Sequence, residues 1–467
     1  MYDLIITNGR VASEHDVLPL DIAVHGERIV ALGVRGQFED VGAVRVIDAA
    51  GTYVVPGGID PHVHFDLAMS ETMVAQRPGP GSRAALHGGT TTYIDFAYGG
   101  DNHDLVATVQ DKIEATGAAR PHADFALHAM MTGDFPLSTA EQIREVISGG
   151  VVSFKLFTTF SGSETVGGVM SDDGRIYSAM LETERHGGIT MVHCEDECLI
   201  DWHVRKFTAE GKTHFSHIHE ARPALAEESA VRRMVHLARR TGSPLYIVHV
   251  SARESIEAIT EGRERGVDVV AEVLHSNLIW DPSHYLLPQG GRYMNYPPNR
   301  TIEHRDELWS ALADGRAHTL ASDDYTVKLG PKLTGTTIDN IGGGTNSVET
   351  RMAVFWSEGV SARDMSVTRF VELTAAAPAK LFGIYGKKGV LRPGADADIV
   401  LFDPDRRHTF RQDENLHSDC DYSNWDGWEV HGFPVTTILR GHVMVHEGEW
   451  VGPEGIGQFV PGSTPQL

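Results

Sequence analysis

The chain contains 467 residues, enough for one large domain and a smaller one, and its 41% hydrophobic and 22% charged shares are ordinary for a globular protein. The formal net charge of -24 argues against nucleic acid or an anionic membrane as a partner, because both bind a basic face. The first residues lack the pattern of a signal peptide, and no apolar run approaches the roughly 20 residues of a membrane span. Three cysteines are too few for a disulfide framework. We therefore expect a cytoplasmic protein.

Both ends of the chain are predicted to be rich in short strands. Apolar runs separated by turn residues occur at 3–7, 21–24, 29–33, 397–402, 436–440 and 442–446. The amino-terminal unit has too few residues for a core of its own, so it needs a partner. We expect residues 1–54 and 376–467 to form one small β-sandwich domain, in which each end supplies strands that the other lacks.

Between these ends, short apolar runs alternate with longer helix-like segments. The eight runs are 53–59, 91–97, 124–130, 151–157, 189–195, 245–250, 267–273 and 319–323. Eight such strands separated by helices are typical of a (β/α)8 barrel, whereas an open doubly wound sheet would not require eight repeats. The predicted fold class is α/β: a (β/α)8 TIM barrel at 55–375 with a small β-sandwich built from both chain ends.

Six metal-binding or titratable side chains fall at the carboxyl ends of these predicted strands. His62 and His64 are two residues apart, so both rings point to the same face of a strand. A His-x-His pair alone is weak evidence in a chain with 25 histidines, and a single strand-end histidine can simply cap a loop. The whole set shares the rim on which barrel active sites are built; it consists of His62, His64, Lys155, His193, His249 and Asp323.

Lys155 is the informative member of this set. A free amine is protonated at neutral pH and repels metal ions, but reaction with carbon dioxide turns it into an anionic carbamate that bridges two cations. His62, His64 and Asp323 would then hold one ion, and His193 and His249 the other. Two such ions lower the pKa of a shared water and give a bridging hydroxide, with Asp323 as general base and later as acid. The set predicts metal-assisted hydrolysis of an amide-like bond.

The sequence resembles the cyclic amidohydrolases of the amidohydrolase superfamily, the hydantoinases and dihydropyrimidinases, over essentially its whole length. The resemblance is carried by Pro56 to His64, Gly88 to Thr92, Ser153 to Lys155, Arg222-Pro223, Val348 to Arg351 and Tyr422 to Trp428. It implies two Zn2+ ions per chain bridged by N6-carboxylated Lys155, which requires CO2 or bicarbonate. It also implies ring opening of a hydantoin or dihydropyrimidine to an N-carbamoyl amino acid, and a homotetramer or homodimer.

Three positions depart from the family pattern. The family usually has a tyrosine where this chain has Phe160, so an oxyanion donor worth about 3 kcal/mol is missing. Thr158, Thr159 or the metal would have to replace it, or the substrate differs. Tyr296 stands where the family has a substrate-gripping serine, and its main chain could keep that contact. Asp324 replaces a histidine and either approaches the metals or turns outward.

Asn340 resembles the substrate-binding asparagine of the family, although the glycine-rich loop that follows it is longer than usual. Asn340, Tyr296 and Phe160 are therefore the predicted substrate contacts. Two alternatives remain open. The enzyme could open a related ring, such as a cyclic imide, allantoin or dihydroorotate. A non-catalytic dihydropyrimidinase-like scaffold is the other, but such relatives have lost metal ligands that this chain keeps.

Overall fold

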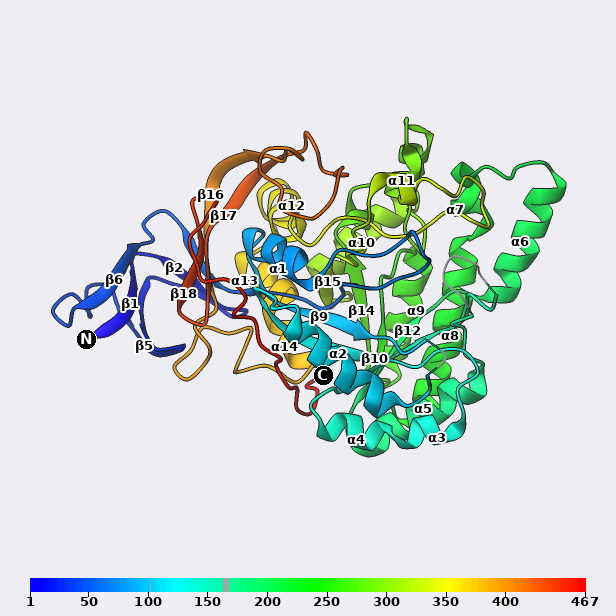
Figure 1. The fold of residues 1–467 in the computed structure, drawn as a ribbon, viewed down its shortest axis with the longest axis horizontal. Helices are drawn as coiled ribbons and strands as arrows, with labels where there is room; N and C mark the ends of the chain where they lie inside the picture. Colours follow the sequence, from blue (N-terminus) through cyan, green and yellow to red (C-terminus); the bar gives the residue numbers. More distant parts are fainter. Residues whose placement is uncertain (101, 163–167) are drawn as a thin grey trace.

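The structure is a computed structural model that describes residues 1–100, 102–162 and 168–467. Its centre is a barrel of eight parallel strands, in the spatial order β15-β14-β13-β12-β11-β10-β9-β8, surrounded by helices (Figure 1). The barrel strands are β8 (Gly58–Asp60), β9 (Thr90–Ala97), β10 (Asp124–Met130), β11 (Ser153–Phe157), β12 (Ile189–His193), β13 (Leu245–Ile247), β14 (Val269–Leu274) and β15 (Thr319–Ala321).

The barrel strands are apolar along most of their length because both of their faces are buried. Every residue of β9 and of β10 is buried, which is typical of parallel strands covered by helices. The two outer strands approach each other just beyond their ends, where Val63 forms a parallel bridge with Asp324 and His64 N donates to Asp324 O at 2.8 Å. The predicted eight-stranded barrel is confirmed and is nearly closed.

Amphipathic helices form the outer layer of the barrel. α8 buries Ala226, Ala230, Val231 and Met234 at helical spacing, and it ends at Gly242 in the left-handed conformation. The helices are α1 (Pro78–His87), α2 (Leu105–Ala118), α3 (Leu137–Glu141), α4 (Ile143–Ser148), α5 (Asp173–His186), α6 (Glu197–Ala209), α7 (Ile218–Ala221), α8 (Ala224–Thr241), α9 (Arg253–Glu264), α10 (Ile302–Asp314), α11 (Leu329–Lys332), α12 (Arg351–Phe355), α13 (Val367–Val371) and α14 (Ala377–Leu381), with short helical segments η1 (Phe215–His217), η2 (Ser276–Leu278), η3 (Pro282–Leu286), η4 (Gly290–Tyr293), η5 (Trp356–Ser361) and η6 (Glu372–Ala376).

Strands from both chain ends form two further sheets beside the barrel (Figure 1). A four-stranded sheet has the order β5-β4-β1-β6, and a seven-stranded sheet has the order β19-β18-β17-β16-β7-β2-β3. The two sheets share an apolar core that includes Ile6, Ile22, Val54 and Ile399. The expected sandwich of strands from both ends is confirmed. Its strands are β1 (Tyr2–Thr7), β2 (Arg10–Ala12), β3 (Val17–Leu18), β4 (Leu20–His25), β5 (Arg28–Val34), β6 (Ala43–Asp48), β7 (Tyr53–Pro56), β16 (Ile399–Thr409), β17 (Glu429–Leu439), β18 (His442–His446) and β19 (Glu449–Trp450).

The run predicted as one strand from Tyr53 to Ile59 is divided between the two parts of the molecule. β7 pairs with β16 in the seven-stranded sheet, whereas β8 pairs with β9 in the barrel. The break falls at Gly57, where an added Cβ would lie only 2.1 Å from Thr91 Oγ1. A glycine is required for so close an approach of the backbone, and the chain passes from one sheet to the other at this point.

Two segments of the carboxyl-terminal part return to the barrel. Residues 410–428, between β16 and β17, contact loops that follow the barrel strands. Cys420 Sγ donates to Val327 O at 3.1 Å, and Asn346 Nδ2 donates to Tyr422 O at 2.6 Å. Residues 455–462 lie at the opposite end of β10, where Val460 N donates to Phe125 O at 2.7 Å. Within the described residues, no helix has the length and apolar character needed to cross a membrane.

Candidate active site

A pocket of about 180 Å³ lies at the carboxyl ends of the barrel strands. All six predicted metal ligands line it, together with Phe160 and Tyr296. The lining residues are His62, His64, Leu67, Ala68, Met69, Tyr98, Met130, Lys155, Phe157, Phe160, Val169, His193, His249, Asn295, Tyr296, Asp323, Tyr325, Gly343 and Gly344.

His62, His64 and Asp323 converge on one point of this pocket. Asp323 Oδ1 lies 3.1 Å from His62 Nε2 and 3.1 Å from His64 Nε2. Donor atoms bound at roughly 2 Å to one tetrahedral ion have a similar spacing. Burial acts to raise the pKa of Asp323, but the facing imidazoles outweigh it and hold this pKa well below the usual range. The carboxylate is therefore anionic at neutral pH and attracts a cation.

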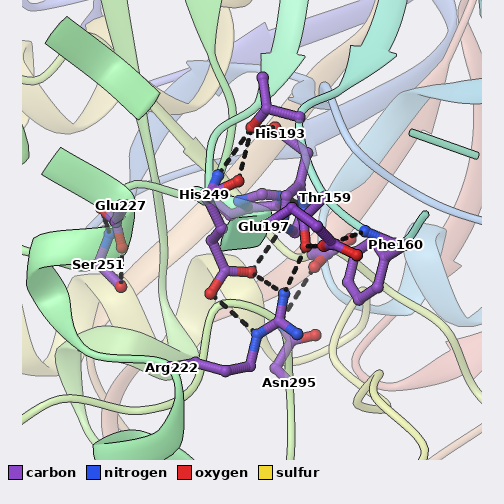
Figure 2. Close-up of polar contacts among 12 residues, drawn as sticks. Thr159, Phe160, His193, Glu197, Arg222, Glu227, His249, Ser251 and Asn295 are labelled. Atoms are coloured by element: carbon purple, nitrogen blue, oxygen red, sulfur yellow. Dashed lines mark hydrogen bonds and ion pairs between the residues drawn. The ribbon is translucent and has the colours of Figure 1, made fainter. Parts of the chain in front are cut away.

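His193 and His249 form a second pair of facing nitrogens. His193 Nδ1 lies 3.0 Å from His249 Nε2 (Figure 2). Burial lowers the pKa of both rings, so both are neutral at neutral pH, and neutral imidazole is the form that binds metals. His249 Nδ1 is buried and has no hydrogen-bond partner in the described part of the chain. These five side chains, with Lys155 beside them, have the donor chemistry and spacing of a metal centre.

Two buried glutamates orient these histidines, and neither role was predicted from the sequence. Glu272 Oε1 lies 2.8 Å from His62 Nδ1 and accepts from His249 N at 2.8 Å. Glu195 Oε2 lies 2.8 Å from His193 Nε2. Carboxylates behind metal-binding histidines fix which ring nitrogen faces the ion. A charged residue inside the apolar run of β14 is the signal that could have identified Glu272.

Arg222 connects Glu195, which orients His193, to the aromatic residues of the pocket wall (Figure 2). Its Nη2 lies 2.6 Å from Glu195 Oε2, and although burial opposes ionisation, Arg222 and His193 lower the pKa of Glu195 to about 2. The same guanidinium lies 4.8 Å from the ring centres of both Phe160 and Tyr296. Arg222 itself does not line the pocket; among the described residues, Phe160 and Tyr296 lie between its guanidinium and the pocket interior.

Glu197, the first residue of α6, holds the backbone that carries Phe160. Its carboxylate accepts from Thr159 Oγ1 at 2.5 Å and from Phe160 N at 2.9 Å (Figure 2). Thr158 Oγ1 donates to the carbonyl oxygens of His193 and Glu195. Both threonine hydroxyls are therefore occupied elsewhere, and neither threonine lines the pocket. The two threonines considered as replacements for the missing tyrosine hydroxyl are directed away from the reacting centre.

Lys155 is buried at the base of the pocket between aromatic rings. Its Nζ lies 5.0 Å from the ring centre of Phe157 and 5.6 Å from that of Phe96. Burial lowers the pKa of Lys155 to about 8, against the opposing effect of Glu272 and Asp323. About one tenth of the amine is therefore unprotonated at pH 7, far more than in an ordinary lysine, and this neutral form is nucleophilic.

Three residues of the pocket other than glycine have backbones in the left-handed region, which such residues rarely adopt. The φ angles are 52° at Asp323, 38° at His249 and 70° at Phe160. Such conformations are costly and concentrate at functional sites, where the surrounding structure holds them. The hydrogen bonds from His249 N to Glu272 and from Phe160 N to Glu197 supply this support for two of the three.

Asn295 and Tyr296 complete one wall. Asn295 Nδ2 donates to Asp323 Oδ2 at 3.0 Å, a contact that was not predicted from the sequence. Tyr296 Oη donates to Ile341 O at 2.7 Å, and its ring lies 5.4 Å from that of Phe160 with their planes nearly perpendicular. Tyr296 therefore fastens the 341–344 loop to the pocket and presents its ring to the interior.

The structure does not bring Asn340 to this pocket. Asn340 is exposed, and its Oδ1 accepts from Thr336 N at 3.0 Å and Thr337 N at 2.9 Å. Among the described residues of this loop, Gly343 and Gly344 are the ones that line the pocket. The length of the glycine-rich loop separates the asparagine from the wall that it was expected to form.

Asp324 turns away from the pocket, as one of the two alternatives expected. It is fully buried, and its carboxylate accepts from Ser347 N at 2.8 Å, Val348 N at 3.0 Å and Gln76 Nε2 at 3.1 Å. Burial raises the pKa of Asp324. This side chain anchors the 345–348 loop beside the pocket.

Comparisons with known proteins agree with this geometry. The model of the family described as "Amidohydrolase family" matches residues 53–444. The D-hydantoinase of Geobacillus stearothermophilus is 33% identical over 462 residues, which cover 98% of this chain and 96% of that protein. The D-phenylhydantoinase of Escherichia coli O1:K1 / APEC is 31% identical over 460 residues, covering 98% of this chain and 97% of that protein.

Solved structures extend the similarity to the whole fold. The crystal structure of dihydropyrimidinase from Brevibacillus agri NCHU1002 superposes with a TM-score of 0.91 at 32% identity and covers 100% of both chains. The barrel and the sandwich built from both chain ends are thus shared with this solved structure. The chain belongs to the amidohydrolase family and is a hydantoinase/dihydropyrimidinase-like cyclic amidohydrolase.

Proposed function

We propose that this enzyme hydrolyses a neutral cyclic ureide that carries an apolar substituent, a 5-substituted hydantoin in the first place, to an N-carbamoyl amino acid. The observation that carries this proposal is the character of the pocket wall. Apart from the candidate metal ligands, the wall is mainly aromatic and apolar, with Met69, Met130, Phe157, Phe160 and Tyr296 among its members. Such a surface favours an apolar ring substituent.

A charged substrate fits this wall poorly. The carboxylate of dihydroorotate requires a cationic partner once it is desolvated, and arginine is the usual one. No arginine is found among the described residues that line the pocket, and Lys155 is its one basic side chain outside the histidines. Allantoin carries a polar ureido group that also needs several hydrogen-bond partners. We therefore place hydantoins ahead of both.

We propose His62, His64, Lys155, His193, His249 and Asp323 as ligands of two Zn2+ ions, with Lys155 carboxylated by CO2 or bicarbonate. When bound, these ions would polarise the scissile carbonyl and lower the pKa of the attacking water. Bound ions would in this way also supply the oxyanion stabilisation for which Phe160 has no hydroxyl.

The proton is handled by Asp323. Its pKa is held well below the usual range, so the carboxylate is ionised at neutral pH and free to accept a proton, but it is a weak base. The transfer therefore depends on the acidification of the attacking water that a bound metal would supply, and the hydrogen bond from Asn295 fixes the second oxygen of Asp323. Asp323 then returns the proton to the ring nitrogen that leaves as the ring opens. Glu272 and Glu195 keep His62 and His193 in the required orientation throughout.

The proposal is tested with purified protein supplied with zinc and bicarbonate. Hydantoin, 5-phenylhydantoin, dihydrouracil, dihydroorotate, allantoin and succinimide are each incubated with it, and addition of one water is scored by mass spectrometry. We expect the highest kcat/KM for 5-phenylhydantoin and no turnover of dihydroorotate. A preference for dihydroorotate or allantoin would refute the assignment of a neutral, apolar substrate, and a preference for succinimide would move it to the cyclic imides.

We also propose that the enzyme is a homotetramer. α6 lies at the edge of the molecule that is distant from the sandwich (Figure 1), and Trp202 on this helix is 57% exposed. A single exposed aromatic side chain is ordinary on a protein surface, so the proposal rests on the family resemblance, and Trp202 is a candidate contact in such an assembly. Light scattering on the purified protein gives the mass directly, and Trp202→Glu is expected to shift it toward smaller species.

A further inference from the structure

A second cluster of metal-binding side chains lies outside the pocket. His87 is the last residue of α1, Glu349 precedes α12, and His417 belongs to the 410–428 segment. One potential ligand atom from each lies within 4.8 Å of the other two. None of the three is among the described residues that line the catalytic pocket.

His87 has an unsatisfied nitrogen. The residue is only 6% exposed, and its Nε2 is buried with no hydrogen-bond partner among the residues that the structure describes. Its ring lies flat against that of His417, with the ring centres 3.3 Å apart. A buried polar atom without a partner is costly, and a missing ligand is one of the ordinary explanations for it.

Glu349 supplies the negative charge and positions His417. Its Oε1 lies 2.6 Å from His417 Nδ1, and its Oε2 accepts from His417 N at 2.8 Å. Glu349 is 6% exposed, so its carboxylate is largely shielded from solvent, and water screens its attraction for a cation only weakly. A similarly close pairing of histidine nitrogen and carboxylate oxygen joins His64 to Asp323 in the pocket.

The donor set selects a class of ion. Two imidazole nitrogens and one carboxylate oxygen suit zinc and neighbouring divalent transition metals, whereas calcium and magnesium prefer oxygen ligands alone. Ligands bound at roughly 2 Å to one ion lie roughly 3–4 Å apart, which is near the present spacing of the three donor atoms. The two rings are stacked within 10° of parallel, so one of them has to turn about its Cβ–Cγ bond to direct its in-plane lone pair at an ion shared with the other.

The cluster is also accessible. His87 and His417 line a polar hollow of about 530 Å³ whose other members include Glu414, Glu447 and Glu449. The hollow provides a path for an ion and space for a water to complete its coordination, and its carboxylates offset the charges of Arg83 and Arg406.

We propose that His87, Glu349 and His417 bind one divalent transition-metal ion in a site separate from the catalytic pocket. The ion would join α1, the segment before α12 and the 410–428 segment, which are far apart in the sequence. Its role is to hold the 410–428 segment against the barrel.

The experiment counts ions in the full-length protein. Metal-depleted protein is dialysed against Zn2+, and bound zinc per chain is measured by mass spectrometry for wild type, His87→Asn, His417→Asn and Glu349→Gln. His408→Asn is the matched control, because His408 lines the same hollow but lies outside the cluster. We expect each cluster variant to bind one ion fewer per chain than wild type, and His408→Asn to match wild type. Mg2+ is expected to leave the count unchanged.

A second readout follows the segment itself. Zn2+ is expected to slow proteolytic cleavage within 410–428 in wild type and in His408→Asn, and not in His417→Asn. Circular dichroism identifies any variant that fails to fold. If the histidine variants do not fold, the zinc content of the isosteric Glu349→Gln variant is compared with that of wild type. Equal zinc content in wild type and in all folded cluster variants would overturn the proposal. His62→Asn, which alters only the pocket, separates this outcome from a failure of the catalytic assignment, since it should keep the cluster's ion.

Discussion

The carboxylate of Glu272 lies 2.8 Å from His62 Nδ1, and the same oxygen accepts the backbone N–H of His249. One side chain in β14 therefore fixes two candidate metal ligands, one from each half of the proposed metal pair. The pair is completely buried, because Glu272 is 0% and His62 1% exposed.

We expect Glu272→Gln to weaken metal binding by about 10–100-fold, because the amide is a poorer partner for the histidine that it orients. Competition with a chelator measures this affinity, and kcat/KM at saturating metal shows how much activity returns. Tyr246→Phe is the matched control: it removes the bond to Glu272 Oε2 at 2.8 Å but leaves His62 paired, and a much smaller effect is expected. Unchanged metal affinity in Glu272→Gln would contradict the orienting role.

Asp323→Asn and Asp324→Asn should separate chemistry from stability. Asp323→Asn removes the group that accepts the proton, and kcat is expected to fall by about 10²–10⁴-fold in protein that still folds. Asp324→Asn replaces one of the two acceptor oxygens by an NH2 group, so that contacts with either the 345–348 loop or Gln76 are lost. This loss costs about 1–3 kcal/mol and lowers the thermal midpoint while the chemistry survives. Kinetics and thermal unfolding are measured on both. The reverse pattern would show that the two roles have been exchanged.

The aromatic wall should determine the preferred ring substituent. Phe160→Ala is expected to lower kcat/KM for 5-phenylhydantoin roughly tenfold more than for unsubstituted hydantoin, because the substituent loses its apolar contact. Phe160→Leu keeps most of the apolar volume and should give an intermediate result. An equal loss for both substrates would mean that Phe160 supports the fold of the pocket and does not contact the substituent.

Carboxylation of Lys155 should depend on pH in a defined direction. Burial lowers the pKa of Lys155 to about 8, so the reactive neutral amine becomes more abundant as pH rises through that value. At a fixed concentration of dissolved CO2, recovery of activity by metal-free enzyme is therefore expected to accelerate between about pH 7 and about pH 9. Uptake of 13C-labelled CO2, followed by mass spectrometry, should accelerate in parallel in wild type and be absent in Lys155→Ala. A rate independent of pH would exclude the neutral amine as the reacting form.

Much of the architecture could be predicted because local sequence carries it. The run 124–130 was predicted as a strand and is β10 over the same residues, since an apolar segment of that length between turns has few other structures available. The six strand-end side chains line one pocket for the same reason, because parallel strands present their carboxyl ends to a single rim.

Contacts between distant segments could not be predicted from the sequence. Nothing near Glu272 indicates that its partner is His62, 210 residues earlier, because the pairing arises only when β14 and β8 join the same barrel. Asn340 was misplaced relative to the pocket because loop conformation, unlike strand position, is not determined by hydrophobic pattern. The division of the run 53–59 depended on how closely Thr91 approaches Gly57.

The late position of the 410–428 segment in the chain bears on when the loops around the pocket are supported. This segment is hydrogen-bonded to the loops that surround the pocket, through Cys420 to Val327, Tyr422 to Asn346 and Asn424 to Arg292. A nascent polypeptide can fold its barrel strands early, yet these loops acquire their supports only after residue 424 of 467 has left the ribosome. The loops around the pocket are therefore held by contacts that form later in synthesis than the barrel strands themselves.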